Sequence, residues 1–326
     1  MTLNAECTLV VPVYRNEENI PGLLARMADL HARVAGGIRV LAVVDGSPDL
    51  SFERLREGFA AAPYASRLLL LSRNFGSFAA IRAGLAEVQT PYMAVMSADL
   101  QEPADLFESL FAKLREGSQD LLLASRTGRR DPWFSRLSSG LFWGLYRRLV
   151  QPEMPAGGVD VFACNALFRD RLVAFGESNS SLVGQLLWLG FRRAEVPYQR
   201  QARELGRSAW TLRRKLRYLA DSVFSFSDLP IRVFLAAGGL GLLASVGFGL
   251  AVLLARLSGA IEVPGYTATV LAVLFFSALN LFGLGVIGSY VWRGFENTKA
   301  RPLAVVMQRE DYNIESENPS QTGPTA

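Results

Sequence analysis

The chain of 326 residues has only two cysteines and one histidine, and this scarcity excludes several kinds of chemistry. Cys7 and Cys164 each lie in an apolar run, without the spacing of a disulfide framework or a metal site. We therefore expect two buried, reduced thiols. His31 lies in a helical pattern and matches no motif. Zinc chemistry and histidine-based catalysis are not predicted.

Signals for export, dinucleotide binding and nucleic-acid binding are also missing. The opening MTLNAECTLVVPVY has neither a basic stretch nor a cleavage site, so the N-terminal domain is expected to stay in the cytoplasm. No Gly-rich fingerprint follows the first apolar run, which argues against an NAD-dependent enzyme. The net charge is only +4, and its Arg-rich stretches accompany no nucleic-acid motif. Phosphate-rich ligands or an anionic membrane surface are the preferred partners.

Short apolar runs alternate with helical patterns over the first 125 residues. Strands are expected at 7–14, 38–44, 67–72, 92–97 and 120–125, and further strands at 159–168 and 194–198. Apolar strands joined by helices are typical of a parallel sheet covered on both faces, so the fold class predicted is α/β. Ligands of such sheets bind beyond the carboxyl ends of the strands.

Two long segments without charge, 233–255 and 263–292, are each longer than the roughly 20 residues that cross a bilayer. Apolar residues at helical spacing before them, with Arg and Lys between, predict a helix at the membrane surface. An ordinary surface helix is the alternative. The predicted organisation is a cytoplasmic catalytic domain (1–210), an interfacial helix (211–232), a transmembrane hairpin (233–292, with spans at about 233–255 and 266–292) and a cytoplasmic tail (293–326), disordered from 310.

Polar residues follow four of the predicted strands. Asp45 begins a Gly-Ser-Pro turn and can accept hydrogen bonds from a base or ribose. Arg73 lies where a helix begins, a position that suits anionic groups. Asp99, Gln101 and Glu102 carry the oxygen donors that Mg²⁺ or Mn²⁺ accepts beside a diphosphate. For Asp99, a helix N-cap before Pro103 is the alternative.

The segments VVPVYRNEENI, VVDGSPD, LSRNFGSFAAIRAGL, SADLQEP and GRSAWTLRRKLRYLADSVFSFSDLPIR resemble, in this order, family 2 glycosyltransferases of the GT-A fold. More narrowly, they are similar to the polyprenyl-phosphate glycosyltransferases, which include dolichol-phosphate mannose synthases and the bacterial enzymes that glucosylate undecaprenyl phosphate. The resemblance covers residues 7 to about 300. It implies an inverting transfer from a nucleotide-sugar, expected to be UDP-linked, to a polyprenyl phosphate, with Mg²⁺ or Mn²⁺.

The resemblance also implies a role for each matching residue. The nucleoside would be held by Pro12, Tyr14, Glu17 and Asp45. Metal and diphosphate would be bound by Asp99 and Gln101, and phosphates would lie near Arg126, Arg136 and Ser139. Asp160 matches a position proposed as a base or as an organiser of the acceptor. Arg207 and Ser208 match a loop that closes over the donor and acceptor phosphates.

Two departures from the family pattern bear on the metal. Val44 stands where the family commonly has the first Asp of Asp-Asp-Gly-Ser, and Ser97 replaces the first Asp of Asp-Ala-Asp. Metal binding would then depend on Asp99 and Gln101.

A glycosyltransferase-like membrane scaffold with weak or lost catalysis is the alternative function. A processive polysaccharide synthase is disfavoured because no Gln-x-x-Arg-Trp signature is present. Small residues in the hairpin also permit a homo-oligomer.

The distribution of Lys and Arg predicts the topology of the hairpin. Positive charges precede the first span and follow the second, whereas the connecting loop contains only Arg256. By the positive-inside rule, both termini of this multi-pass protein are cytoplasmic and residues 256–264 lie outside the inner (plasma) membrane.

A cysteine introduced into the loop at residues 256–264 should react with an impermeant maleimide in intact cells. Labelling only after lysis would contradict this orientation.

Overall fold

The computed structural model describes residues 5–126, 153–155, 158–201, 221–224, 227, 229–258 and 265–313. Its strands are β1 (Cys7–Val13), β2 (Ile38–Val44), β3 (Ser66–Leu71), β4 (Tyr92–Val95), β5 (Leu121–Arg126), β6 (Val159–Asn165), β7 (Arg193–Tyr198) and β8 (Val306–Tyr312). Its helices are the short η1 (Glu17–Asn19), then α1 (Ile20–Arg33), α2 (Ser51–Ala60), α3 (Ser77–Ala86), α4 (Ala104–Arg115), α6 (Ala166–Val173), α7 (Leu182–Trp188), α9 (Leu229–Leu257) and α10 (Tyr266–Thr298).

The strands form one sheet in the order β7-β5-β6-β4-β1-β2-β3-β8. β4, β1, β2 and β3 pair in parallel, whereas β6 and β8 run antiparallel to their neighbours. The central strands are rich in Val and Leu and almost wholly buried, as expected for strands covered on both faces. The predicted fold class, a mostly parallel α/β sheet followed by two apolar helices, is confirmed.

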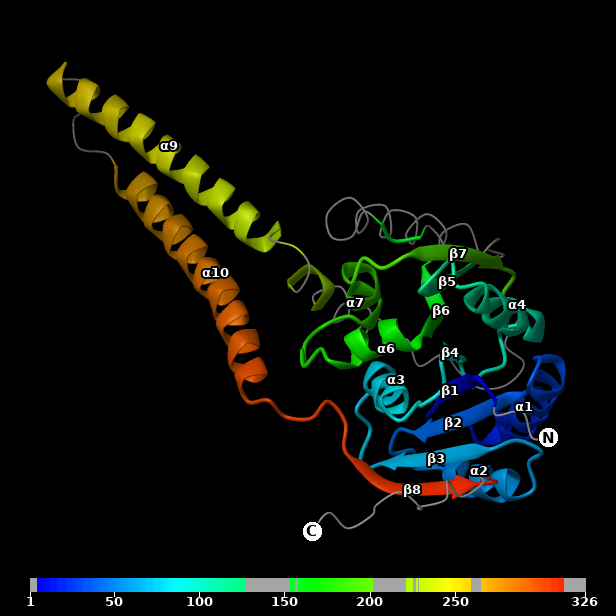
Figure 1. Ribbon diagram of the computed structural model, residues 1–326. Coiled ribbons are helices and arrows are strands. Elements are labelled where there is room, and N and C mark those ends of the chain that lie inside the picture. Colours follow the sequence, from blue (N-terminus) through cyan, green and yellow to red (C-terminus); the bar gives the residue numbers. More distant parts are fainter. Residues whose placement is uncertain are drawn as a thin grey trace, which may run out of the picture.

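Helices cover both faces of the sheet (Figure 1). Neighbouring side chains of a strand point to opposite faces, and β1 shows this alternation. Leu9 belongs to a core with Leu23 of α1 and Phe107 of α4, whereas Val10 belongs to a core with Leu85 of α3. α1, α2 and α4 thus pack on one face, and α3, α6 and α7 on the other.

Each of the four parallel strands is followed by a turn with a left-handed residue. These are Arg15 (φ 54°), Gly46 (φ 54°), Gly76 (φ 99°) and Leu100 (φ 57°). At Gly46 a Cβ atom would lie 2.3 Å from the backbone of Arg73, so only glycine fits. A left-handed residue other than glycine costs about 1–3 kcal/mol, and such strain clusters at functional sites. The strain at Arg15 and Leu100 therefore directs attention to this edge of the sheet.

β8 is a strand that the sequence analysis missed. It follows α10 and pairs antiparallel with β3 at the edge of the sheet. The expectation of a disordered tail from residue 310 is wrong for residues 310–312, which belong to β8. The sequence MQREDY has no apolar alternation because β8 is a largely exposed edge strand, which needs no apolar face.

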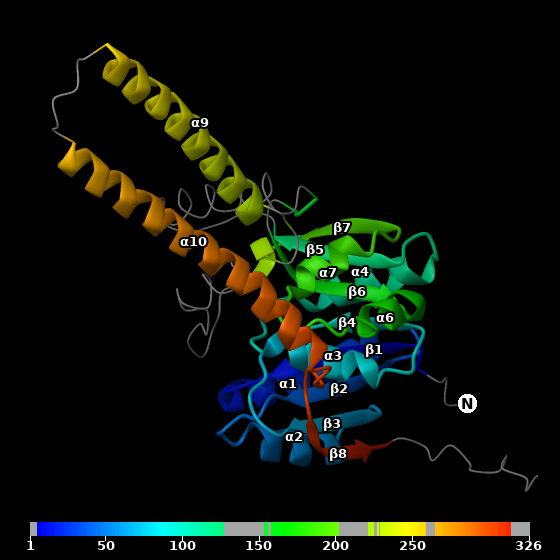
Figure 2. The same cartoon turned by 90° about the vertical axis from the view of Figure 1, so that its left-hand side faces the viewer.

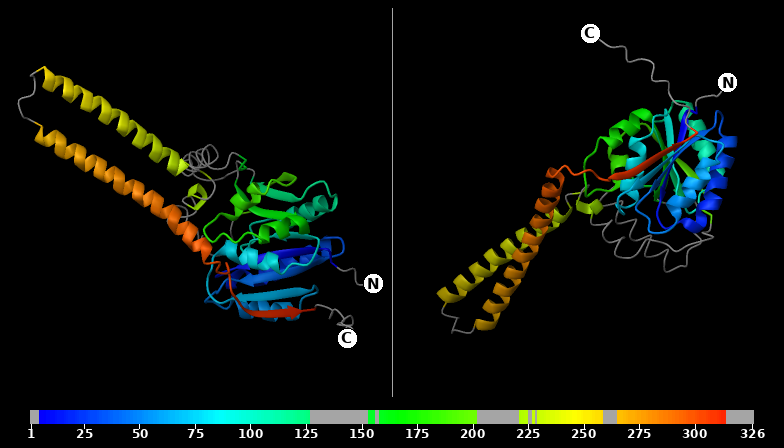
Figure 3. Two further views of the ribbon diagram at one scale, coloured as in Figure 1. Left: turned by 60° about the vertical axis from the view of Figure 1, so that its left-hand side comes forward. Right: turned by 90° about the horizontal axis from the view of Figure 1, so that it is seen from below.

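The apolar helices α9 and α10 lie side by side and project away from the domain (Figures 2 and 3). Both are long and apolar enough to cross a membrane. Phe234 of α9 packs against Gly283 of α10, where a Cβ atom would lie 2.0 Å from its ring. Large apolar side chains such as Leu243 and Leu284 are exposed along both helices. In water this surface would be costly, and an apolar environment would relieve that cost.

The last turns of α10 are tied to the α/β domain. The Arg293 guanidinium forms an ion pair with Asp221 at 2.8 Å and donates to the carbonyl oxygen of Asn179 at 3.2 Å. Asn297 Oδ1 accepts hydrogen bonds from the backbone and the hydroxyl of Ser178. The loop between α6 and α7 is therefore a direct contact between the domain and the hairpin.

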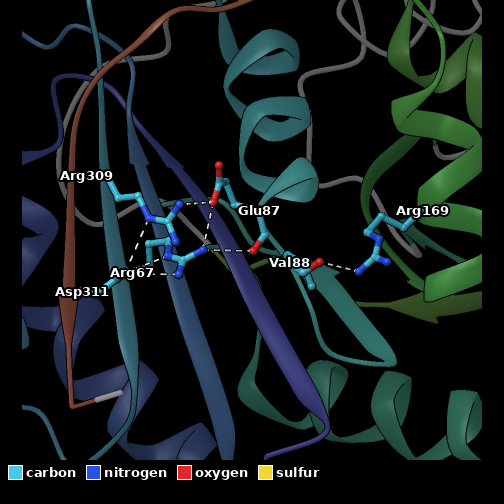
Figure 4. A network of polar contacts seen from close by, with 6 residues as sticks. All are labelled: Arg67, Glu87, Val88, Arg169, Arg309 and Asp311. Atoms are coloured by element: carbon cyan, nitrogen blue, oxygen red, sulfur yellow. Dashed lines mark hydrogen bonds and ion pairs between the residues drawn. The ribbon is translucent and has the colours of Figure 1, made fainter. Parts of the chain in front are cut away.

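A charged network fastens β8 to the domain (Figure 4). The Arg67 guanidinium on β3 contacts both carboxylate oxygens of Asp311, at 2.6 and 3.2 Å, and Glu87 at 2.9 Å. Arg309 of β8 reaches the same Glu87 oxygen at 3.0 Å. The Arg67 side chain is only 13% exposed, so solvent screens this pair less than a surface ion pair.

The pairing of β8 with β3 can be tested by cross-linking. Arg67 and Asp311 are direct partners in the register, so the double variant Arg67→Cys/Asp311→Cys should form a disulfide on mild oxidation. The diagonal pair Arg67→Cys/Arg309→Cys should not, because diagonal Cα atoms lie about 7–8 Å apart. Peptide mapping by mass spectrometry identifies the link. Cross-linked dimers in place of cross-linked monomers would contradict β8 pairing within its own chain.

Candidate functional site

The turns after β1, β2, β3 and β4 meet at one edge of the sheet, because these strands are parallel and in register. Hydrogen bonds join the turns to one another. Arg15 N donates to Ser47 Oγ at 2.7 Å, and Asn16 Nδ2 donates to the carbonyl oxygen of Ala98 at 3.4 Å. The sequence analysis expected ligands at this edge, and the structure brings its strand-end residues together there.

Two carboxylates hold the turns after β1 and β2. Glu17 accepts a hydrogen bond from Leu50 N at 2.9 Å. Asp49 accepts from Glu17 N at 3.2 Å and from the Ser47 hydroxyl at 2.5 Å. Burial raises the pKa of Asp49, but hydrogen bonds from Ser47, Ser51 and the Glu17 backbone outweigh it, so the pKa lies below its usual value. Asp49 therefore stays ionised, a role that the sequence analysis did not assign to it.

Asp45 is a structural link between two turns. Its side chain is buried, and its two oxygens accept hydrogen bonds from Phe75 N at 2.7 Å and Gly76 N at 2.8 Å. Both donors are backbone amides in the turn that follows β3. A carboxylate that accepts from two amides holds that turn firmly against the end of β2. The hydrogen bonds thus give Asp45 a task beyond the predicted contact with a nucleoside.

Other residues selected from the sequence border this group of turns. Pro12 and Tyr14 are half-buried at the end of β1. Arg73 is exposed in the loop that leads into α3, with its guanidinium 4.0 Å from the ring centre of Phe75. An exposed guanidinium near a helix N-terminus offers a binding position for an anion.

Asp99 lies in a compact cluster of oxygen atoms after β4. The Ser97 hydroxyl lies 2.7 Å from Asp99 Oδ1 and 2.5 Å from Glu102 Oε2. Glu102 is 1% exposed, and its backbone oxygen accepts a hydrogen bond from Arg26 at 2.6 Å. Two carboxylates from one turn thus meet at a single hydroxyl group.

Asp99 does not cap the helix that follows it. The N-cap of α4 is Pro103, which makes no side-chain cap hydrogen bond. The alternative weighed for Asp99 is therefore wrong. The left-handed Leu100 reverses the chain between Asp99 and α4. The Asp99 carboxylate consequently faces Ser97 and not the amides of the helix.

Residues that follow β7 join the same cluster. The Arg200 guanidinium lies 3.6 Å from Asp99 Oδ2. The Gln101 side-chain nitrogen donates to the Gln201 carbonyl oxygen at 3.3 Å, and Gln201 N donates to the Gln101 carbonyl oxygen at 2.9 Å. The sequence analysis missed Arg200. Arg200 follows β7, which is parallel to β5, so the rule that ligands bind beyond the carboxyl ends of parallel strands could have found it.

The donor set after β4 fits a hard divalent cation that arrives with a diphosphate. Within the described ranges no three His, Cys, Asp or Glu residues group together as a closed metal site. Mg²⁺ usually takes one or two protein carboxylates and completes its shell with water and phosphate oxygens. Asp99 and Glu102, with the side-chain oxygen of Gln101, supply that kind of incomplete set.

Several predicted residues cannot be placed. Arg136, Ser139, Arg207 and Ser208 lie outside the described residues, as does residue 210 at the predicted domain boundary. Asp160 lies on β6, but its side chain is likewise outside the description. Arg126 ends β5, which runs in the same direction as β7.

The cysteines and the histidine have structural environments. Burial raises the pKa of the Cys7 thiol to about 11 and also raises that of Cys164. Both thiols are free and buried, as predicted. The backbone N–H of Ile38 donates a hydrogen bond to His31 Nδ1 at 3.1 Å. These three side chains belong to the scaffold.

A shallow hollow lies at the opposite edge of the sheet. It is lined by Thr8, Arg39 and Ser66 at the amino ends of β1, β2 and β3, and by Glu87, which follows α3. None of the strand-end residues described above contributes to it. In parallel α/β sheets ligands bind at the carboxyl edge, so this hollow is the weaker candidate.

The structural role of Asp45 can be tested by Asp45→Asn. One of the two backbone donors would then face an amide nitrogen, and a buried donor without an acceptor costs about 1–3 kcal/mol. We expect a lower melting temperature in the absence of any nucleotide. Asp105→Asn, at an exposed position on α4, is the matched control: it loses only a surface ion pair with Arg33 and should lower the melting temperature much less. An unaltered melting temperature for Asp45→Asn would mean that Asp45 serves the ligand alone.

The chain is similar to known glycosyltransferases over nearly its full length. The "uncharacterized glycosyltransferase sll0501" of Synechocystis sp. is 29% identical over 305 residues, which cover 93% of this chain and 95% of the relative. The "uncharacterized glycosyltransferase YkcC" of Bacillus subtilis is 30% identical, with 97% of each chain covered.

Solved structures were compared as well. The mannosyltransferase PcManGT from Pyrobaculum calidifontis, in complex with GDP-Man and Mn²⁺, matches with a TM-score of 0.47 and 17% identity, over 88% of this chain and 87% of that one. The model of the family "Glycosyl transferase family 2" matches residues 8–174, which include the described turns after β1 to β4. With this match and the full-length relatives, the chain belongs to glycosyl transferase family 2.

Proposed function

We propose that this protein is an inverting glycosyltransferase that moves a sugar from a nucleotide-sugar to a polyprenyl phosphate at the cytoplasmic face of a membrane. The observation that carries the proposal is that β8, which follows the apolar hairpin, begins beside Leu71 at the carboxyl end of β3, the edge at which Asp99 also lies. A donor site and an anchor for a lipid acceptor would thus share one edge of the domain.

The donor would lie across the turns after β1 to β4. The nucleoside is assigned to the space bordered by Pro12, Tyr14 and Glu17. Asp45 and Asp49 support that space by fixing its turns. Arg73 is exposed in a neighbouring loop and would contact a phosphate. The chemistry of the turns does not distinguish UDP from GDP, although a UDP-sugar is the donor expected from the resemblance.

A Mg²⁺ or Mn²⁺ ion bound with the diphosphate would be held by Asp99 and Gln101. When bound, such an ion neutralises charge that builds up on the leaving diphosphate. Arg200, at 3.6 Å from Asp99, already balances part of the negative charge at this position. It would also help to hold the diphosphate, because guanidinium groups bind phosphate oxygens in pairs.

The acceptor would approach from the membrane side. Thr298 at the end of α10 and Val306 at the start of β8 are eight residues apart, and an extended chain of that length spans at most about 30 Å. β8 begins beside Leu71, at the carboxyl end of β3. The end of α10 is therefore confined near the edge that would bind the donor. In Figure 1, β2 and β3 point toward the side on which the hairpin lies.

The transfer needs little base catalysis. A phosphate monoester is already anionic at neutral pH, so the acceptor oxygen can attack the anomeric carbon without losing a proton to a strong base. The protein must align the two substrates and stabilise the departing diphosphate. We assign the organisation of the acceptor to Asp160. Arg207, Ser208, Arg126, Arg136 and Ser139 are assigned to the phosphates, as the resemblance implies.

The hairpin would cross the inner (plasma) membrane twice, with the catalytic domain and both termini in the cytoplasm. This orientation follows from the positive charges that flank both spans. Exposed apolar side chains along α9 and α10 also permit contacts with a second copy of the chain. The alternative function, a membrane scaffold with weak or lost catalysis, would make the same use of the hairpin but would not turn over a nucleotide-sugar.

A transfer assay separates the two functions. The full-length protein, in nanodiscs with undecaprenyl phosphate, should convert one member of a panel of UDP- and GDP-sugars into a lipid-linked sugar when Mg²⁺ or Mn²⁺ is present. Asp99→Asn should slow the transfer by about 100-fold or more, because the ion loses its anionic ligand. Asp105→Asn on α4 should keep the wild-type rate.

The outcomes are distinct. Turnover without any dependence on the lipid phosphate would contradict the assigned acceptor. A complete lack of turnover with every donor would favour the scaffold. Equal rates for Asp99→Asn and the wild-type protein would contradict the assigned cation site.

A further inference from the structure

A buried arginine of α3 holds the end of α6. Arg82 is 8% exposed, and its guanidinium donates to the carbonyl oxygen of Val173, at 3.2 Å, and to that of Phe175. Val173 is the last residue of α6. Carbonyl groups at a helix C-terminus have no acceptor role left within the helix, and the helix dipole makes that end negative. The positive charge of Arg82 therefore caps α6 from a neighbouring helix.

Arg82 also reaches the loop between α6 and α7, residues 174–181. Its guanidinium donates to Gln185 Oε1 at 3.4 Å, and the Gln185 amide nitrogen donates to Glu177 of the loop at 3.3 Å. Gln185 is itself buried. A buried charge costs several kcal/mol unless hydrogen bonds and opposite charges compensate for its lost hydration. These compensating groups all come from α6, α7 and the loop, so Arg82 fixes that segment against α3.

The segments joined by Arg82 lead to the two parts of the proposed enzyme. α3 begins directly after the turn that Asp45 holds at the carboxyl edge of the sheet. The 174–181 loop contacts the end of α10, because the amide and the hydroxyl of Ser178 both donate to Asn297 Oδ1. A continuous series of contacts thus runs from the apolar hairpin through the loop and Arg82 to the helix that starts at the donor edge.

We propose that Arg82 is a positioning residue for the transfer reaction. It holds the loop that carries the hairpin in a fixed orientation relative to α3, so that a lipid acceptor held beside the hairpin meets the anomeric carbon of the donor. Arg82 itself touches neither substrate. This inference rests on the proposed function, to which it adds a residue that aligns the two substrates.

The test separates alignment from donor binding. Arg82→Met removes the charge and the hydrogen bonds but keeps a long, unbranched side chain. Asp45 and Asp49 hold the donor turns without Arg82, so the affinity for UDP or GDP with Mn²⁺, measured by calorimetry, should stay within about 2-fold of the wild-type value. Transfer to undecaprenyl phosphate in nanodiscs, at saturating donor, should fall about 10-fold or more, because a small displacement of one substrate has such an effect.

A conservative variant supplies the rescue. Arg82→Lys keeps a charged donor for the carbonyl groups but loses the planar fork, so it should retain more transfer than Arg82→Met and less than the wild-type protein. If Arg82→Met does not fold, Arg82→Lys carries the same comparison, with a several-fold loss of transfer at unchanged nucleotide affinity.

Arg169 on α6 provides a matched control. Its side chain is 14% exposed and donates to the carbonyl oxygen of Val88, two residues beyond the end of α3 (Figure 4). This contact is the reverse of that made by Arg82, but it lies beside the amino-edge hollow and not at the 174–181 loop. Arg169→Met should also lower the melting temperature, yet its transfer rate should stay within about 3-fold of the wild-type rate.

A double-mutant cycle tests whether Arg82 acts through the loop. Asn297→Ala removes the acceptor of Ser178 and so loosens the loop from α10. Arg82→Met/Asn297→Ala should be at most about 2-fold slower than the slower single variant, because residues of one network are not additive. Independent, multiplicative losses would overturn the proposal. So would wild-type transfer in Arg82→Met, or an equal loss of transfer in Arg169→Met.

Hydrogen–deuterium exchange gives a readout that needs no sugar transfer. In Arg82→Met, exchange should become faster at residues 174–181 and at 293–298 of α10, whereas Arg169→Met should leave both segments as in the wild-type protein. Unchanged exchange in Arg82→Met would overturn the role of Arg82 and leave the proposed function intact. Faster exchange at both segments in a protein that does not glycosylate polyprenyl phosphate would support the link to the hairpin and contradict the acceptor.

Discussion

Parallel, in-register pairing of β4, β1, β2 and β3 is the constraint on which the candidate site depends. It brings the turns that follow the four strands to one edge, although they are far apart in the sequence. Hydrogen bonds between turns then fix their relative positions. Asp45 joins the end of β2 to the turn after β3. Asp49, in the turn after β2, joins that turn to the turn after β1. Chemistry at this edge therefore rests on a rigid frame in which each turn supports another.

The hairpin is coupled to that frame at two places. Arg293 and Asn297 contact the loop between α6 and α7, and β8 extends the sheet beside β3. A flexible tether would allow the domain to take many orientations relative to the two apolar helices. Two attachments restrict these orientations, so the carboxyl edge of the sheet and the end of α10 stay close. For an enzyme with a lipid acceptor, this arrangement lowers the entropic cost of bringing the substrates together.

Much of the fold could be predicted from the sequence because the central strands are continuous apolar runs. The strands predicted at 7–14 and 38–44 differ from β1 and β2 by at most one residue. β8 could not be predicted in this way. As an exposed edge strand it carries charged residues, and its place is seen in its backbone pairing with β3 and its ion pairs with Arg67 and Glu87. The segments around Arg136 and Arg207 lie outside the described residues, so their assignments stay predictions.

The sequence predicted which strand ends come together at the candidate site, but only part of the contacts between them. The rule that ligands bind at the carboxyl edge placed Asp45 and Asp99 at the ends of β2 and β4, and the structure has both residues at that edge, whereas their part in binding stays a prediction. Sequence patterns do not give the side-chain hydrogen bonds, however. These show that Asp45 supports a neighbouring turn and that Ser97 bridges Asp99 and Glu102. Such contacts depend on left-handed residues such as Leu100, whose conformation is not evident from a leucine in the sequence.

The central claim, that a nucleotide diphosphate and a divalent cation bind at the carboxyl edge, can be tested by hydrogen–deuterium exchange. The exchange of the full-length protein would be compared with and without UDP or GDP and Mn²⁺. The account predicts slower exchange in the turns at residues 14–19, 45–50, 73–77 and 97–102, and no change at the amino ends of β1 to β3. Protection centred on Thr8, Arg39 and Glu87, with none in the four turns, would contradict it.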